Sequence, residues 1–192
     1  MTLMIGTESC SSRACLKDYF PDDIPEEWKL DYYSNDFPIL LITQNCWLNS
    51  DFLTYIEDSE PCKLLIEINF PFKYQSVLNQ TINKLGVYFY GIVVKYNHER
   101  NIISAINDQF SSLTSHLFLI HNNNYIINKK NYTITVNANA TSIAYYYVKL
   151  NHNATMSDLV TILDTVNSGI LIVNTSNFNA LQNIMTLKQS IL

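Results

Sequence analysis

Seven short runs of apolar residues recur along the chain, separated by longer and more polar segments. They span residues 3–6, 39–43, 63–68, 87–94, 116–120, 143–150 and 170–174. Most of these runs are continuously apolar, whereas a strand with one solvent-exposed face alternates apolar and polar side chains. Continuous runs are typical of parallel strands that are covered on both faces. The pattern therefore predicts an α/β protein with a largely parallel sheet.

Two of the intervening segments have the periodicity of amphipathic helices. Over 72–85, five apolar residues share one helical face, and Gly86 supplies a stop before the next apolar run. These five are Tyr74, Val77, Leu78, Ile82 and Leu85. Over 156–166, the corresponding face carries Met156, Leu159, Val160 and Leu163, with Thr155 or Ser157 available as the N-cap.

One segment departs from this strand–helix order. Residues 122–139 alternate in short stretches around a polar centre, which indicates a β-hairpin in place of a crossover helix. We predict an incomplete (β/α) barrel of the TIM type, with an open doubly wound sheet as the alternative. Pairing of the first strand with the last distinguishes the two. Because no linker-like segment or internal repeat is present, residues 1–192 are expected to form a single α/β domain.

Composition narrows the class of protein further. The chain has 192 residues, of which 47% are hydrophobic, so it can bury a sizeable core. Its apolar run at 86–94 is about half the roughly 20 residues needed to cross a bilayer. The N-terminal stretch lacks the features of a signal peptide, so we expect a cytoplasmic protein without a membrane partner. The net charge is −5 and the 12 Lys and Arg residues are scattered, which disfavours nucleic acid as a partner.

Cofactor and metal sites receive little support from the sequence. Only four glycines occur, whereas a phosphate-binding loop needs several within a few residues. The HExxH and GxSxG signatures of zinc proteases and α/β-hydrolases are also missing. The four cysteines, at positions 10, 15, 46 and 62, are expected to be free thiols, and their spacing does not suit structural zinc. We therefore expect neither a cofactor nor a metal.

Polar residues at strand ends are the remaining candidates, because ligands of parallel α/β proteins bind at the carboxyl ends of the strands. Glu8, just past the first strand, and Glu67, inside an apolar strand, are candidate catalytic acids or bases. Cys10 is a candidate ligand-binding thiol. The alternative is that Glu8 and Cys10 cap or contact the following loop. Glu67, in turn, either points into a polar site, pairs with a base or lies at an exposed strand end.

Three residues near the C-terminal end are candidate ligand-binding groups. Lys149 ends one apolar run and His152 follows it, so together they can bind an anionic or hydroxylated ligand. Asn174 ends the last run and can hydrogen-bond a ligand. The alternatives are a solvated loop pair for the first two and a backbone turn for Asn174. The triplet Tyr145–Tyr147 is interpreted as packing between helices and sheet.

Near its N-terminus the chain carries the segments IGTES and DYFPDDIPEEWKLDYYSNDF. They resemble the first strand end, the Phe-Pro element and the aromatic helix of the YecE family, also known as domain of unknown function 72. The residues in those places are Gly6, Phe20, Pro21, Leu30, Tyr32, Tyr33 and Phe37. The segments YYYVKLNHN, SDLVTIL and ILIVNTSNFNALQNIMTLKQSIL resemble its late strands and closing helix. The resemblance implies a TIM-barrel-like fold and no established reaction.

The chain departs from the family at several strand ends, so two functions stay open. In the first, Glu8 or Glu67 is the acid/base of a hydrolysis, and Lys149 and His152 orient a small polar or anionic substrate. In the second, the chain is a non-catalytic binding or assembly protein that has lost the family's site. It would contact a protein partner through aromatic residues between 19 and 28, which include Tyr19, Phe20 and Trp28.

Overall fold

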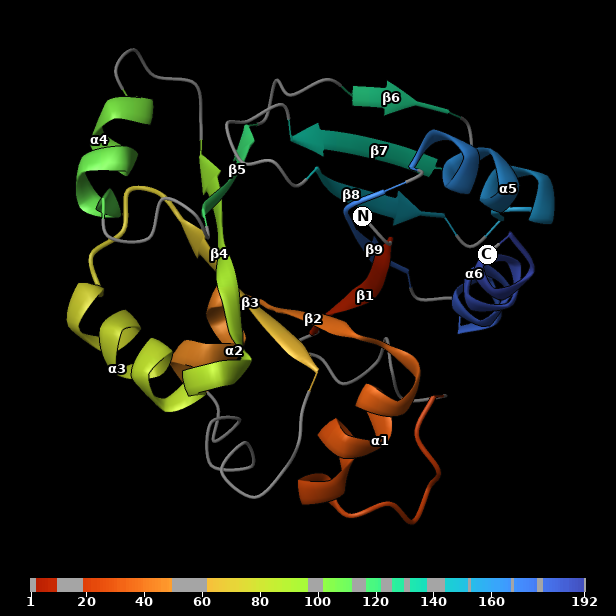
Figure 1. Cartoon of the computed structure of the whole chain (residues 1–192), viewed down its shortest axis with the longest axis horizontal. Helices are drawn as coiled ribbons and strands as arrows, with labels where there is room; N and C mark the ends of the chain where they lie inside the picture. Colours follow the sequence, from red (N-terminus) through yellow and green to blue (C-terminus); the bar gives the residue numbers. More distant parts are fainter. Residues whose placement is uncertain are drawn as a thin grey trace.

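The computed structural model of the chain describes residues 3–9, 19–49, 62–96, 102–111, 117–121, 126–129, 132–137, 144–151, 153–166, 168–175 and 178–191. These residues form a nine-stranded sheet with the strand order β5-β4-β3-β2-β1-β9-β8-β7-β6 (Figure 1). The strands are β1 (Met4–Ser9), β2 (Ile39–Ile42), β3 (Lys63–Asn69), β4 (Phe89–Tyr96), β5 (Leu117–His121), β6 (Ile126–Asn128), β7 (Tyr132–Asn137), β8 (Tyr145–Leu150) and β9 (Ile170–Asn174).

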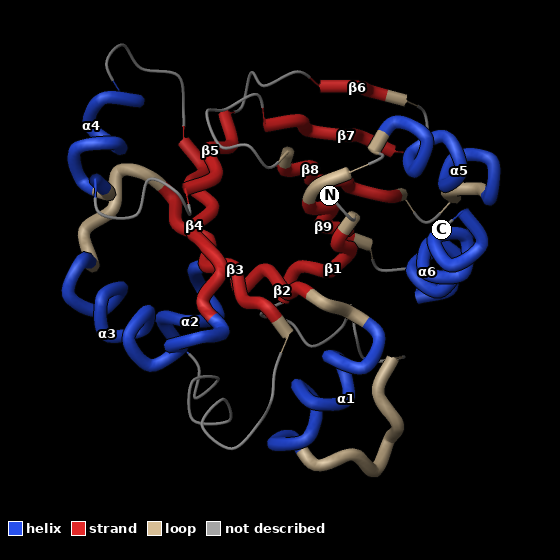
Figure 2. Tube along the Cα trace, in the orientation of Figure 1, coloured by secondary structure: helices blue, strands red, loops and turns tan. Residues whose placement is uncertain are grey.

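The seven strands predicted from the apolar runs are all present and mutually parallel. They are β1 to β5, β8 and β9. Strand β1 pairs with β2 on one side and with β9 on the other, so the first strand pairs with the last parallel strand. Figure 2 shows that the sheet curls, and β5 at one edge contacts β7 near the other. The fold is a half-barrel, which confirms the predicted incomplete barrel over the open doubly wound sheet.

Helices surround the outside of the curled sheet (Figure 2). They are α1 (Lys29–Asp36), α2 (Gln44–Asn49), α3 (Gln75–Leu85), α4 (Ile102–Gln109), α5 (Met156–Thr165) and α6 (Phe178–Ile191), with short 3-10 turns η1 (Glu26–Trp28) and η3 (Gly86–Tyr88). Thr155 is the N-cap of α5 and forms a capping box with Asp158, which selects one of the two predicted caps. None of the helices in the described ranges has the length and apolar character that crossing a bilayer requires.

The predicted hairpin is present and stands where a crossover helix would otherwise connect β5 to β8. Strands β6 and β7 are antiparallel, and β7 also pairs antiparallel with β8. The sheet therefore ends in an antiparallel pair at one edge, while the parallel part carries the strand ends at which ligand sites are expected.

Both faces of the parallel strands are buried, and this explains their continuously apolar sequences. One buried cluster combines strand residues with helix residues such as Leu78, Ile106 and Ile162, so it lies between the sheet and the helices. The other consists of strand residues alone and fills the inner side of the curl: Ile39, Leu41, Leu65, Val93, Phe118, Tyr145, Ile170 and Ile172. Each strand thus sends alternate side chains to the helices and to the interior.

The predicted apolar face of α3 is wrong at its N-terminal end. The buried residues of this helix are Leu78, Thr81 and Leu85, whereas Tyr74 and Val77 are 50% and 39% exposed. The buried stripe therefore starts at Leu78 and continues at i+3 and i+7, and Val77 lies one residue off it. Met156 at the start of α5 is likewise exposed, and Ile162 is buried in its helix instead.

The Tyr33 hydroxyl bridges strands β1 and β2. It accepts hydrogen bonds from the backbone amide of Thr7, at 2.9 Å, and from the Thr7 hydroxyl, at 3.1 Å. It donates to the Ile39 carbonyl oxygen, at 3.0 Å. The neighbouring Gly6 lies so close to β2 that a Cβ on it would be 1.9 Å from the same carbonyl oxygen. This region fixes the course of β1 just before Glu8.

Candidate functional site

The interior of the half-barrel changes from apolar to polar toward the carboxyl ends of the strands. Five polar side chains come from five strands in this layer: Glu8 from β1, Glu67 from β3, Lys95 from β4, Tyr147 from β8 and Asn174 from β9. Four of them point to the same side of their strand as a residue of the interior cluster two positions earlier: Leu65 before Glu67, Val93 before Lys95, Tyr145 before Tyr147 and Ile172 before Asn174. The polar layer therefore lies directly above the apolar floor.

Glu8 is held by two side chains from the neighbouring part of the sheet. The Tyr147 hydroxyl donates a short hydrogen bond to Glu8 Oε2. Asn174 Nδ2 lies 2.6 Å from the same oxygen and 2.7 Å from the Tyr147 hydroxyl oxygen. Burial raises the pKa of Tyr147, and the adjacent Glu8 charge raises it further, so the phenol remains a proton donor at neutral pH.

Glu67 and Lys95 form a second pair in the same layer. Lys95 Nζ lies 2.5 Å from Glu67 Oε2, and the two side chains are 30% and 7% exposed. Burial raises the pKa of Glu67 above its ordinary value of 4.5, and the charge of Glu8 also raises it. The Lys95 ammonium and a hydrogen bond from the Gln44 backbone lower this pKa without offsetting burial. Glu67 therefore titrates closer to neutrality than an ordinary glutamate.

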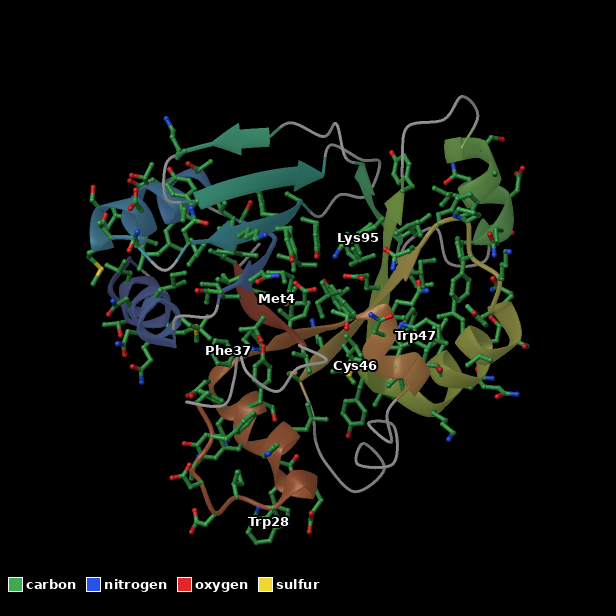
Figure 3. All side chains as sticks on the ribbon, turned by 180° about the vertical axis from the view of Figure 1, so that it is seen from behind. Met4, Trp28, Phe37, Cys46, Trp47 and Lys95 are labelled. Carbon is green, nitrogen blue, oxygen red and sulfur yellow. The ribbon has the colours of Figure 1, made fainter. Side chains whose placement is uncertain are left out.

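Lys95 connects the two pairs. Its ammonium lies 5.1 Å from the centroid of the Tyr147 ring, a cation–π distance, while it pairs with Glu67. Figure 3 labels Lys95 on β4, beside the centre of the curled sheet. The influence of Glu8 on the pKa of Glu67 also places the two carboxyl groups within electrostatic reach of each other. The five side chains thus form one interacting cluster, which we call the carboxyl-end cluster.

The short helix α2 supports the β3 side of this cluster. The indole Nε1 of Trp47 donates to the Glu67 carbonyl oxygen at 2.9 Å in a buried hydrogen bond. The Gln44 side-chain oxygen accepts from the backbone amide of Asn69 at 2.6 Å. The backbone from the Glu67 carbonyl to the Asn69 amide is therefore held by the segment that follows β2, which restricts where the Glu67 carboxylate can point.

The structure brings together three of the residues predicted for the site. Glu8, Glu67 and Asn174 all belong to the carboxyl-end cluster, although Glu8 lies inside β1 and not just past it. Lys149 is exposed and lies on the same strand face as Tyr147, two residues closer to the carboxyl end. Cys10 and His152 lie outside the described residues.

Sequence reasoning missed two members of the cluster, Lys95 and Tyr147. Lys95 follows the apolar run that predicted β4, but that strand continues to Tyr96. Tyr147 was grouped with its neighbours as core packing, whereas strand alternation sends Tyr146 to the helix side and Tyr147 to the interior. If the apolar run at 87–94 is extended by two residues, which is one repeat of a strand, it includes Lys95.

A comparison with protein-family models, with curated proteins and with solved structures finds no significant match. Among the described residues, no group of three or more His, Cys, Asp and Glu side chains is arranged to hold a metal ion. Cys62 is a free thiol, and burial raises its pKa to about 12, so this thiol is unreactive at neutral pH.

Proposed function

We propose that the carboxyl-end cluster binds a small polar ligand and that Glu67 is the acid/base group acting on it. The observation that carries this proposal is the placement of two carboxyl groups in one cluster: Glu8 bonds Tyr147 and Asn174, and Glu67 pairs with Lys95, whose ammonium lies over the Tyr147 ring. Two such groups in different environments can divide the roles of acid and base. A hydrolysis is the reaction class that this division supports best.

The environments of the two carboxyl groups suggest their roles. Glu67 is buried and its pKa is raised above its ordinary value, which favours a group that can give a proton to a ligand and take it back. Glu8 is fixed by donors from Tyr147 and Asn174, so its position suits alignment of a ligand hydroxyl. The exposed Lys149, on the same strand face as Tyr147, supplies a positive charge for an anionic substituent.

We also propose that the chain belongs to the YecE family and that it is located in the cytoplasm. A curled parallel sheet is the fold that the YecE resemblance implies, and it supports that assignment. The free thiol of Cys62 supports a cytoplasmic location, where disulfides are rare.

Replacing Glu67 with glutamine tests the acid/base role. Against p-nitrophenyl phosphate and a set of p-nitrophenyl glycosides, we expect Glu67→Gln to lower kcat/KM for any substrate turned over by at least about 100-fold, because an amide cannot exchange the proton. Glu27→Gln, at an exposed position of η1, is the matched control and should keep full activity. Equal turnover by Glu67→Gln and the unmodified chain would remove Glu67 from the mechanism.

A non-catalytic assembly role is the second candidate, and one observation favours it. Trp28 is 63% exposed and Tyr32 is 39% exposed at the α1 end of the molecule, far from the carboxyl-end cluster (Figure 3). Exposed Trp and Tyr commonly anchor protein contacts. The predicted contribution of Tyr19 is wrong, because this residue is buried among aromatic rings and its hydroxyl donates to Asp36. Phe20 is partly buried against the same aromatic rings.

Self-association measured by sedimentation velocity tests the assembly role. If Trp28 anchors a contact between copies, the sedimentation coefficient should rise with protein concentration, and Trp28→Ala should abolish that rise. Val87→Ala is the control, because Val87 is 90% exposed on η3, away from α1. A chain that stays monomeric at all concentrations, or a Trp28→Ala variant that associates normally, contradicts this candidate.

A further inference from the structure

Tyr145 is a buried tyrosine of the interior whose hydroxyl has no hydrogen-bond partner among the described residues. Its exposed fraction is 0%, and it lies on β8 two residues before Tyr147, on the same strand face. Its ring packs against Phe118 of β5, with the centroids 5.6 Å apart. Buried hydroxyl groups in proteins are nearly always hydrogen-bonded, so this one requires a physical reason.

The other fully buried tyrosine with a described hydroxyl environment shows the contrast. Tyr33 uses its hydroxyl completely, since it accepts from the Thr7 amide and hydroxyl and donates to the Ile39 carbonyl. A phenylalanine at Tyr33 would leave all three groups without this partner. A phenylalanine at Tyr145 would remove a polar group that contributes no hydrogen bond within the described part of the chain.

Tyr145 lies in the interior of the half-barrel, on the same face of β8 as the cluster residue Tyr147. After burial itself, the groups that raise the pKa of Tyr145 are Tyr147, Glu67 and Glu8, all of them cluster members. The phenol is therefore protonated at neutral pH and able to donate. Tyr147 lies nearby but already donates its own hydrogen to Glu8 and accepts from Asn174. The missing element for Tyr145 is an acceptor oxygen.

We propose that Tyr145 is a further ligand-binding residue, whose hydroxyl donates to an oxygen of a polyhydroxylated ligand that also contacts Glu8 and Glu67. This inference rests on the proposed function and deepens it by naming the ligand class. The carboxylates accept hydrogen bonds and Tyr145 donates one, so the ligand must do both with neighbouring atoms. Hydroxyl groups do both, whereas an ammonium group only donates and a phosphate dianion only accepts. A monosaccharide with adjacent hydroxyl groups satisfies all three residues.

Thermal unfolding with named probes tests the inference. Midpoints are measured for the full chain and for Tyr145→Phe, Tyr33→Phe and Tyr146→Phe, each alone and with D-glucose, D-mannose, D-glucose 6-phosphate or inorganic phosphate at rising concentration. We expect the ligand-free midpoint of Tyr145→Phe to equal or exceed that of the unmodified chain, and its Kd for a binding sugar to be about tenfold weaker. Tyr33→Phe should lower the midpoint, and Tyr146→Phe, on the helix side of β8, should leave the sugar affinity unchanged.

Each other outcome overturns a specific statement. A lowered ligand-free midpoint for Tyr145→Phe would show that the hydroxyl is bonded within the protein, and equal sugar affinity in this variant would remove it from the site. In both cases the proposed function stands without Tyr145. A midpoint of the unmodified chain that rises only with inorganic phosphate would refute the polyhydroxylated ligand class while keeping an anion site. If no probe raises that midpoint, the proposed polar-ligand function and the inference that rests on it both fail for these ligand classes.

Discussion

Gly6→Ala is expected to destabilise the protein by about 3 kcal/mol or more, because the new methyl group has no space. An ideal Cβ on Gly6 would lie 1.9 Å from the carbonyl oxygen of Ile39 and 2.8 Å from its carbonyl carbon. Both are backbone atoms of β2, so a side-chain rotation cannot relieve the contact. Strand β1 must move away from β2, and the hydrogen bonds of Tyr33 to Thr7 and Ile39 must lengthen or break.

Urea unfolding of the two variants Gly6→Ala and Gly86→Ala measures this effect. Gly86 ends α3 with φ +52° and ψ −121°, a conformation that L residues rarely adopt, and a Cβ there meets no atom within 4 Å, so its substitution costs backbone strain alone, about 1–3 kcal/mol. The urea midpoint of Gly6→Ala should therefore fall below that of Gly86→Ala, with an unchanged slope. Equal midpoints would mean that β1 and β2 can separate at little cost, and the close approach at Gly6 would not constrain the fold.

The apolar runs were sufficient to predict the parallel sheet, though not its curl, because the burial of both strand faces leaves a direct record in the sequence. Each parallel strand is covered by helices on one side and by the apolar interior on the other, so both alternating sets of side chains are apolar. The polar centre at Asn128–Lys130 predicted the hairpin equally well, since a turn needs no buried side chain. Helix faces were less certain, because Thr81 is buried in α3 although its residue type does not mark a core position.

Glu8, Glu67 and Asn174 were predicted as site residues because ligands of parallel α/β proteins bind at the carboxyl ends of the strands. The structure places all three in one cluster. Lys95 and Tyr147 could not be assigned in the same way. Which base pairs with Glu67 depends on the order and register of the strands, and β3 and β4 shift register at Leu64 and Leu65. A short apolar segment does not encode that shift. The unpartnered hydroxyl of Tyr145 is a property of packing in three dimensions and leaves no pattern in the sequence.

Glu67 and Lys95 are more tightly coupled than a surface pair, and this has a consequence for stability. Burial favours the neutral form of Glu67, while the Lys95 ammonium favours the charged form. Removing one partner of such a pair leaves a buried charge uncompensated, which typically costs 3 kcal/mol or more, whereas removing both can be nearly neutral. The stability of single and double variants at Glu67 and Lys95 therefore measures the coupling directly.

Lys95→Met is expected to lower the free energy of unfolding by about 3 kcal/mol at pH 7 and to recover as the pH falls. In this variant the pKa of Glu67 rises further, because the group that lowered it is gone. A carboxyl group with a raised pKa in the folded state stabilises that state below its unfolded pKa, near 4.5, and this contribution is lost as the pH rises through the folded pKa.

Urea unfolding between pH 4.5 and 8, with the added variant Glu67→Gln/Lys95→Met, measures the effect. The double variant should be more stable than Lys95→Met at pH 7 and should lack its additional pH dependence, since glutamine does not titrate. If Lys95→Met were as stable as the unmodified chain at pH 7, with the same pH profile, Glu67 would not depend on Lys95 for its charge.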